Sequence, residues 1–197
     1  MNDLERQLRL ITQQLQALKR EFALVGGLAV SARAEPRLTR DADLAVAVAD
    51  DRDAEHLIHL LQQDGYSVAA VVEQRTTGRL ATVRLTNGSA HGVVTDLLFA
   101  SSGIESEVVA SAEPLAVVPN LTLPVAVVGH LIAMKLLARD DRQRPLDADD
   151  LRALAAIASE ADWETAAAAT QLIAQRGCAR GRDLSVALNA LRNDGAY

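Results

Sequence analysis

Two glycines and two aspartates carry the clearest chemical signal in this sequence of 197 residues. Gly26 and Gly27 end an apolar run, and thirteen residues separate them from Asp41, which opens a second apolar run together with Asp43. An apolar strand that turns at glycine into a helix directs backbone N–H groups at an anion such as phosphate. Aspartates two apart on a strand project to the same face, where a divalent cation such as Mg²⁺ offsets their repulsion. Phosphate and metal sites this close together indicate nucleotide chemistry.

Each part of this pattern also has a simpler explanation. A Gly-Gly pair is often only a turn, and an Asp-x-Asp pair is often a solvated strand end. Asp96 is the only charged residue in the run 92–99, and alone it is explained as the exposed side of a half-buried strand. Together with Asp41 and Asp43 it completes a candidate two-metal site, in which one ion activates the attacking oxygen and the other holds the leaving group.

Lys135 is the only formally charged side chain between residues 114 and 138. It lies beside the apolar stripe of an expected helix. Two explanations stand: a lysine whose ammonium reaches water along an apolar surface, or a cation that binds a nucleotide triphosphate. Asp147 follows in the segment 144–151, where it caps the next helix or, with Arg144, orients Lys135 or the nucleotide.

Composition and charge narrow the class of protein. Hydrophobic residues make up 49% of the chain, which excludes a disordered protein. The net charge of −6 argues against a strongly basic nucleic-acid platform, but arginines gather at 139–144 and 176–182. Each cluster is either a solvated loop or a basic lip for an RNA backbone. A single cysteine, a charged N-terminus and the lack of a bilayer-spanning apolar run predict a cytoplasmic protein with no membrane partner.

Apolar periodicity predicts an α/β half followed by a helical half that packs on it. Helices are expected at 3–20, 27–35, 51–64, 125–139, 147–159, 162–176 and 184–192. Strands are expected at 22–25, 41–48, 66–72, 80–86, 92–99 and 115–118. Asp50 or Asp51 caps the helix at 51–64, which ends at Gly65. The pair Asn87-Gly88 predicts a hairpin turn between the strands at 80–86 and 92–99. The predicted domains are a core at 1–120 and a helical domain at 121–197.

At this point the motifs resemble a known family. The glycine pair, its spacing to Asp-x-Asp and the later strand aspartate resemble the nucleotidyltransferase superfamily that includes DNA polymerase beta. Lys135 and the pattern Arg…Asp-x-x-Asp-Leu, here from Arg144 to Leu151, are similar to the AbiEii and MenT group of toxins. The resemblance implies an α+β fold, with a mixed nucleotidyltransferase sheet, flanking helices and a C-terminal helical bundle.

The same resemblance implies Mg²⁺-dependent transfer of a nucleoside monophosphate from an NTP to a hydroxyl, with release of pyrophosphate. MenT-like members add pyrimidine nucleotides, from CTP or UTP, to the 3′ end of tRNA. This addition blocks aminoacylation and translation, and a partner antitoxin protein neutralises the toxin. The expected partners are therefore an NTP, the tRNA acceptor end and a cognate antitoxin.

The family pattern also assigns roles by position. The metal ligands it implies are Asp41, Asp43 and Asp96, with Lys135 binding the triphosphate and Asp147 as a supporting catalytic residue. The nucleotide-binding residues it implies are Gly26, Gly27, Ser31, Thr39, Arg40, Lys135 and Arg144. The superfamily often has Gly-Ser where this chain has Gly-Gly, and the hydroxyl one helical turn later, on Ser31, is the candidate replacement.

Three further interpretations stay open. A phosphate on Thr39, two residues before Asp41, would add about two negative charges beside the metal carboxylates and act as an off-switch. The alternative for Thr39 is a loop threonine that caps its own turn. The function of the protein also has two alternatives. In the first, it is a small-molecule nucleotidyltransferase that inactivates an aminoglycoside or lincosamide. In the second, the nucleotidyltransferase fold is catalytically silent and binds a partner. Retention of the three carboxylates and the lysine argues against a silent fold.

Overall fold

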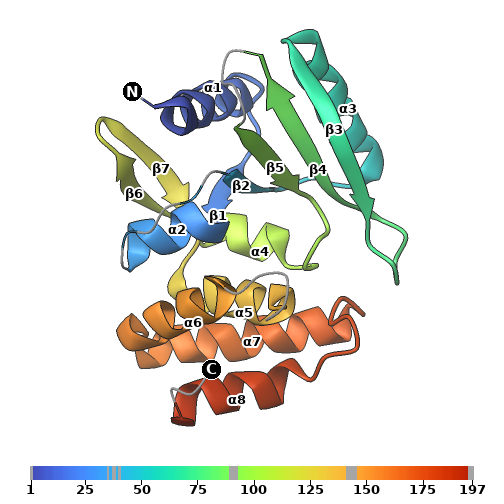
Figure 1. Ribbon diagram of the computed structural model, residues 1–197. Coiled ribbons are helices and arrows are strands. Elements are labelled where there is room, and N and C mark those ends of the chain that lie inside the picture. Colours follow the sequence, from blue (N-terminus) through green and yellow to red (C-terminus); the bar gives the residue numbers. More distant parts are fainter. Residues whose placement is uncertain are drawn as a thin grey trace.

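Seven strands form one mixed sheet in the computed structural model, which describes residues 2–34, 36, 39, 41–88, 93–140 and 146–194 (Figure 1). The strands are β1 Phe22–Val25, β2 Asp41–Val46, β3 Tyr66–Glu73, β4 Leu80–Asn87, β5 Val94–Leu98, β6 Glu113–Val118 and β7 Leu121–Val125. Their order across the sheet is β3–β4–β5–β2–β1–β7–β6. The strands that carry the predicted carboxylates, β2 and β5, therefore lie side by side near the middle of the sheet.

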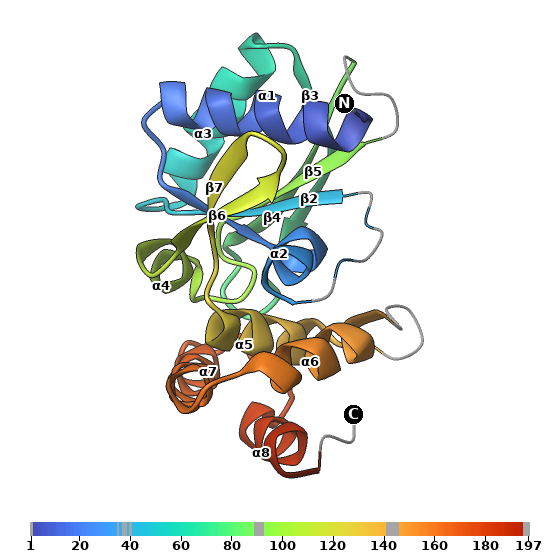
Figure 2. The same cartoon turned by 90° about the vertical axis from the view of Figure 1, so that its left-hand side faces the viewer.

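Eight helices accompany the sheet in the described part of the chain. They are α1 Asp3–Ala17, α2 Gly26–Arg33, α3 Asp51–Gln63, α4 Glu105–Ala110, α5 Val128–Ala138, α6 Leu146–Ile157, α7 Glu160–Gln175 and α8 Leu184–Asp194. α1 and α3 cover one face of the sheet, and α2 and α4 lie on the other (Figure 2). α5 to α8 form a helical bundle beyond α2 and α4, so the α+β architecture matches the predicted one.

Local signals explain where several helices begin and end. The side chain of Asp50 caps α3 by accepting a hydrogen bond from the backbone N–H of Asp53 at 2.9 Å. α3 is followed by Gly65 at φ +89°, a left-handed conformation that suits glycine. At the start of α7, Ser159 and Asp162 form a reciprocal capping box. The cap at Asp50 confirms a prediction, whereas the capping box was not predicted, and α7 begins at Glu160 rather than at 162.

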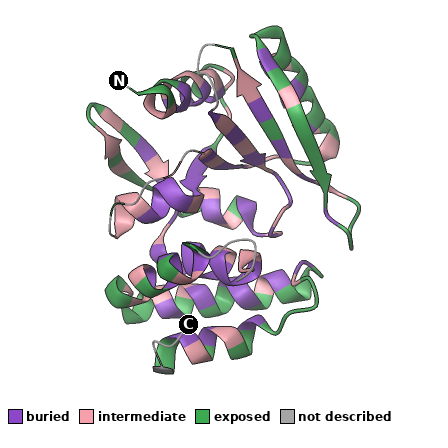
Figure 3. Cartoon of the chain, in the orientation of Figure 1, coloured by how far each residue is buried: buried purple, intermediate pink, exposed green. Residues whose placement is uncertain are grey.

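The buried residues form one continuous hydrophobic core, which runs from Leu8 in α1 to Leu191 in α8 (Figure 3). The sheet centre and the inner faces of the helices are buried, whereas much of the outer strand β3 is exposed. None of the helices in the described segments is long and apolar enough to cross a membrane.

The predicted boundary after residue 120 falls inside a hairpin of the sheet. β7 was not predicted as a strand, but it pairs with β6 in antiparallel and with β1 in parallel through Leu24 and Val125. The sheet therefore continues to Val125, and α5 begins at Val128 rather than at 125. β6 is the neighbour of β7 in the chain, but β7 has only five residues and contains Pro124, which weakens the strand signal. The division into two domains stays a prediction.

The predicted hairpin of β4 and β5 is confirmed, because the two strands pair in antiparallel with Thr86 opposite Val94. Asn87 is the last residue of β4 and Gly88 follows it, so the predicted turn begins at the end of the strand. Residues 89–92 lie outside the described residues. The short helix α4 was not predicted.

Candidate active site

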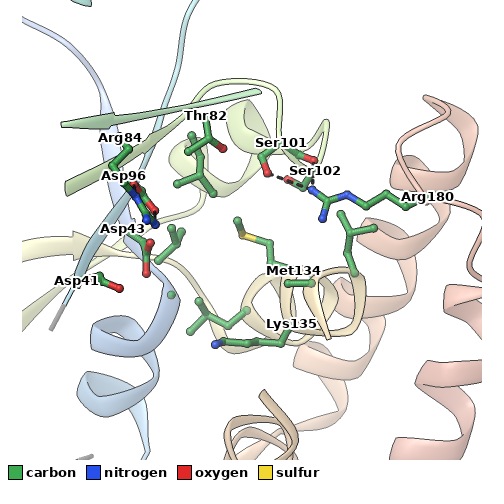
Figure 4. Close-up of a pocket in the computed structure, with 16 residues that line it drawn as sticks. Asp41, Asp43, Thr82, Arg84, Asp96, Ser101, Ser102, Met134, Lys135 and Arg180 are labelled. Atoms are coloured by element: carbon green, nitrogen blue, oxygen red, sulfur yellow. Dashed lines mark hydrogen bonds and ion pairs between the residues drawn. The ribbon is translucent and has the colours of Figure 1, made fainter. Parts of the chain in front are cut away.

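A cavity of about 400 Å³ between the sheet and α5 brings together the three predicted carboxylates, Gly26 and Lys135 (Figure 4). Asp41, Asp43 and Asp96 stand on one side of it, and Met134 and Lys135 come from α5. The lining residues are Val25, Gly26, Asp41, Asp43, Thr82, Arg84, Asp96, Leu98, Ser101, Ser102, Leu131, Met134, Lys135, Leu137, Ala138 and Arg180. The structure thus brings together side chains from four strands, one helix and two loops.

The register of β2 and β5 places the three acidic side chains next to one another. The strands run parallel, and Asp43 lies directly opposite Asp96. Ala42 and Leu44 are fully buried, whereas Asp41 and Asp43 are partly exposed on the other face, as alternation along a strand requires. One face of β2 packs into the core, and the other presents carboxylates to the cavity.

Gly26 forms the turn between β1 and α2 and lies against Asp43. Its φ of +65° favours glycine, and a Cβ built on it would lie only 1.9 Å from Asp43 Oδ2. Glycine at this position therefore lets the backbone at the start of α2 approach the carboxylate closely. The N-terminus of an eight-residue helix beside a cavity is a suitable site for an anionic phosphate.

The other predicted nucleotide-binding residues are less well placed. Gly27 is buried behind Gly26, and neither Gly27, Ser31 nor Thr39 lines the cavity in the described part of the chain. The Ser31 hydroxyl donates a hydrogen bond to the Gly27 carbonyl oxygen at 3.0 Å, within its own helix. Arg40 and Arg144 lie outside the described residues. Replacement of the missing serine hydroxyl by Ser31 stays a prediction.

Lys135 is buried and held by two carboxylates of α6. Its Nζ lies 2.7 Å from Asp147 Oδ1 and 2.6 Å from Asp150 Oδ2, and the lysine side chain is only 7% exposed. A lysine reaching water is therefore the wrong explanation. Asp147 lies within the first turn of α6, and its carboxylate contacts Lys135. Lys135 also lines the cavity, so a role toward a triphosphate stays a prediction.

Arg84 contacts the third carboxylate and was not identified from the sequence. It lies on β4 opposite Asp96 and donates from Nε to Oδ1 at 2.9 Å and from Nη2 to Oδ2 at 2.7 Å. This pairing with Asp96 raises the pKa of the Arg84 guanidinium, with smaller contributions from Asp41 and Asp43. Strand alternation could have placed Arg84 on this face, but its partner depends on the hairpin register.

Arg180 lies on the opposite side of the cavity from the carboxylates (Figure 4). Its Nη2 donates to the carbonyl oxygen of Ser101 at 3.1 Å and to the Ser101 hydroxyl at 3.3 Å. Of the arginine cluster 176–182, Arg176 forms an ion pair with Glu107 instead, and this arginine lowers the pKa of that carboxyl. The cluster therefore contributes one arginine directly to the cavity.

A metal ion can be accommodated by the donor chemistry of the site, but not with all side chains as they lie. Among the described residues no group of three His, Cys, Asp or Glu side chains is close enough to hold a metal, and both oxygens of Asp96 contact Arg84. Asp41 and Asp43 nevertheless offer carboxylate oxygens on one face, the ligands that Mg²⁺ prefers. The Asp43 carboxylate lies directly against the backbone of Gly26 at the start of α2. The residues fit a hard cation once Asp96 is released from Arg84.

The fold is that of the nucleotidyltransferases. The structure is similar to that of an antigenic nucleotidyltransferase-like protein from Paracoccidioides brasiliensis, at 19% identity and a TM-score of 0.55, covering 95% of this chain and 93% of that one. Two other solved structures are more distant. The lincosamide antibiotic adenylyltransferase LnuA, bound to lincomycin, has 16% identity and a TM-score of 0.48. The match covers 80% of this chain and 100% of LnuA. The nucleotidyltransferase toxin MenT4 of Mycobacterium tuberculosis H37Rv has 19% identity and a TM-score of 0.44. The match covers 76% of this chain and 55% of MenT4.

The sequence itself narrows this class. Residues 9–195 match the family described as nucleotidyl transferase AbiEii toxin, type IV toxin–antitoxin system. The chain therefore belongs to the AbiEii family of nucleotidyltransferase toxins, and the resemblance inferred from its motifs is confirmed. No curated protein matched the sequence.

Proposed function

We propose that this toxin transfers a nucleoside monophosphate from CTP or UTP to the 3′ end of tRNA, with Mg²⁺ as cofactor, and thereby blocks translation. The observation that supports it best is the shared cavity in which Asp41, Asp43 and Asp96 stand beside the start of α2. A phosphate chain needs an anion-binding helix terminus, and its transfer needs carboxylates beside the reacting phosphorus. Both lie in one place on this protein.

In the proposed reaction the 3′-hydroxyl oxygen of the acceptor attacks the α-phosphorus of the NTP. A new phosphorus–oxygen bond forms, the bond from the α-phosphorus to the bridging oxygen breaks, and pyrophosphate leaves with that electron pair. The proton of the hydroxyl passes to a carboxylate, for which Asp96 is the candidate. Mg²⁺ held by Asp41, Asp43 and Asp96 would neutralise phosphate charge and lower the pKa of the attacking hydroxyl.

Residues of α2 and of the helical bundle orient the substrates in this proposal. The backbone at Gly26 receives the triphosphate at the N-terminus of α2, where the helix dipole favours negative charge. Lys135, held in place by Asp147 and Asp150 at the α5 side of the cavity, is the candidate hydrogen-bond donor to the triphosphate. Arg180 is the candidate contact for a phosphodiester near the acceptor end, because arginine pairs with phosphate through several donors.

Transfer can be measured directly with each of the four NTPs, labelled at the α-phosphate, and total tRNA. We expect label at the tRNA 3′ end with CTP or UTP, and its loss in Asp43→Asn, which removes a charge with little change in size. The matched control is Asp149→Asn, because Asp149 is 63% exposed, pairs with Arg152 and does not line the cavity. Sequencing the tRNA 3′ ends then identifies the added nucleotide.

The same assay separates the alternatives. Label that appears on an aminoglycoside or lincosamide and not on tRNA would establish the small-molecule enzyme. If no acceptor is labelled and Asp43→Asn still arrests growth on expression as strongly as the unsubstituted toxin, transfer is not the basis of toxicity. Folding of each variant is checked by circular dichroism, so that loss of activity is not confused with loss of structure.

A further inference from the structure

Arg84 holds both oxygens of the one carboxylate that the proposed metal site still requires. The contacts at 2.9 and 2.7 Å form a two-pronged ion pair, a strong geometry for arginine and carboxylate. The Asp96 side chain is only 14% exposed, so little water competes for it. An oxygen engaged in this way is less available to a metal ion. Arg84 and a metal therefore compete for Asp96.

Arg84 itself is able to exchange partners. Its side chain is 47% exposed. Its strand, β4, lies between β5 and the outer strand β3, so Arg84 approaches Asp96 from the outer side of the sheet rather than from its centre. It also lines the cavity, so the anionic phosphates of a nucleotide bound there would lie close to the Arg84 guanidinium. A triphosphate offers the guanidinium the same two-pronged geometry that Asp96 provides.

We propose that Arg84 couples metal binding to nucleotide binding. Arg84 pairs with Asp96 before the nucleotide arrives and transfers to the nucleotide phosphates when it binds, which releases Asp96 to the metal. This inference rests on the proposed function, because it requires a metal site at Asp41, Asp43 and Asp96. Its consequence is thermodynamic: metal and nucleotide each raise the affinity for the other, and Arg84 supplies part of that coupling.

The test measures metal affinity rather than activity. The purified protein is freed of metal with a chelator, and Mn²⁺ binding is measured by calorimetry alone and with a CTP analogue carrying a methylene between the α- and β-phosphorus. We expect Arg84→Gln to bind Mn²⁺ alone about tenfold more tightly, the equivalent of one charge-assisted hydrogen bond. The gain in affinity caused by the analogue should shrink in the same variant.

Two further variants separate the pairing from general charge. Arg79→Gln is the matched control, because Arg79 is 42% exposed, pairs with Asp51 and does not line this cavity. It should leave Mn²⁺ affinity unchanged. Arg84→Lys keeps the positive charge but loses the two-pronged contact, and we expect it to fall between Arg84→Gln and the unsubstituted protein.

The outcomes distinguish this inference from the function on which it rests. If Asp43→Asn weakens Mn²⁺ binding but Arg84→Gln leaves it unchanged or weaker, the metal site stands and the role of Arg84 is refuted. If Asp43→Asn does not alter Mn²⁺ binding, the metal placement itself is wrong and the inference falls with it. If Arg84→Lys binds Mn²⁺ with the same affinity as the unsubstituted protein, then the positive charge alone, and not the two-pronged pairing with Asp96, controls Mn²⁺ affinity.

Discussion

Replacing Gly26 with alanine tests whether the approach of α2 to Asp43 controls the site. Two effects act on this substitution. The first is backbone strain, because residue 26 has φ +65°, where residues with a Cβ are disfavoured. The second is a collision, because the new Cβ would lie 1.9 Å from Asp43 Oδ2 and 2.6 Å from Asp43 Cγ. The carboxylate must therefore move away from its place on the cavity wall.

Gly78 supplies a control for the first effect alone. It has φ +67°, nearly the same backbone strain, but a Cβ there would meet nothing within 4 Å. The left-handed conformation costs a non-glycine residue about 1–2 kcal/mol, so both variants should lose about this much stability. Only Gly26→Ala displaces a carboxylate of the proposed metal site. A misplacement of about 1 Å at a reacting group can lower the rate about 100-fold.

The assay combines urea unfolding with the rate of nucleotide transfer to tRNA. We expect Gly78→Ala to lose stability and keep its transfer rate, and Gly26→Ala to lose at least as much stability and about 100-fold in rate. If Gly26→Ala is folded and transfers nucleotide within about threefold of the unsubstituted rate, the position of Asp43 beside the start of α2 does not limit the reaction. The reasoning from that contact would then be refuted.

Three other predictions follow from buried or charged groups. Lys135→Met should lower the free energy of urea unfolding by about 3 kcal/mol, because it removes the cation that the buried carboxylates of Asp147 and Asp150 both contact, whereas the exposed Asp149→Asn should cost less than about 1 kcal/mol. Burial raises the pKa of Tyr66 from 10.0 to about 12, so this group destabilises the folded state as pH rises through that interval. Tyr66→Phe should flatten that alkaline decline in thermal unfolding experiments, and an unchanged decline would contradict the assignment. Thr39→Glu should lower transfer by adding charge near the carboxylates, and full activity would refute phosphorylation there as an off-switch.

Much of the fold was predictable because its signals are local. β1 matched the expected span, and α3 began at a predicted cap and ended before a predicted glycine. The α+β class and the helical bundle are also confirmed. α4 was not predicted, since it is a short segment that packs on strands distant in the chain. β7 was not predicted because its five residues include Pro124, which weakens the strand signal. The hairpin of β4 and β5 is confirmed, because its turn signal lies between two strands that are neighbours in the chain.

The candidate site shows the same division. Asp41 and Asp43 were recognisable from their alternation on one strand, and Lys135 was recognisable as the only formally charged side chain between residues 114 and 138. Sequence reasoning left open whether Lys135 reaches water, and its two carboxylate partners resolve the question. Arg84 was missed, because nothing in its own segment indicates that β4 and β5 align it with Asp96.

The order of residues along the chain thus settles which groups are available: an anion-binding turn, paired carboxylates and a lysine in an apolar helix. Spacing of this kind depends on neighbours within a few positions, and so it can be recognised without coordinates. Packing settles what those groups contact. Arg84 with Asp96, Lys135 with two acids and Gly26 against Asp43 are contacts between separate elements, and strand register and helix docking create them.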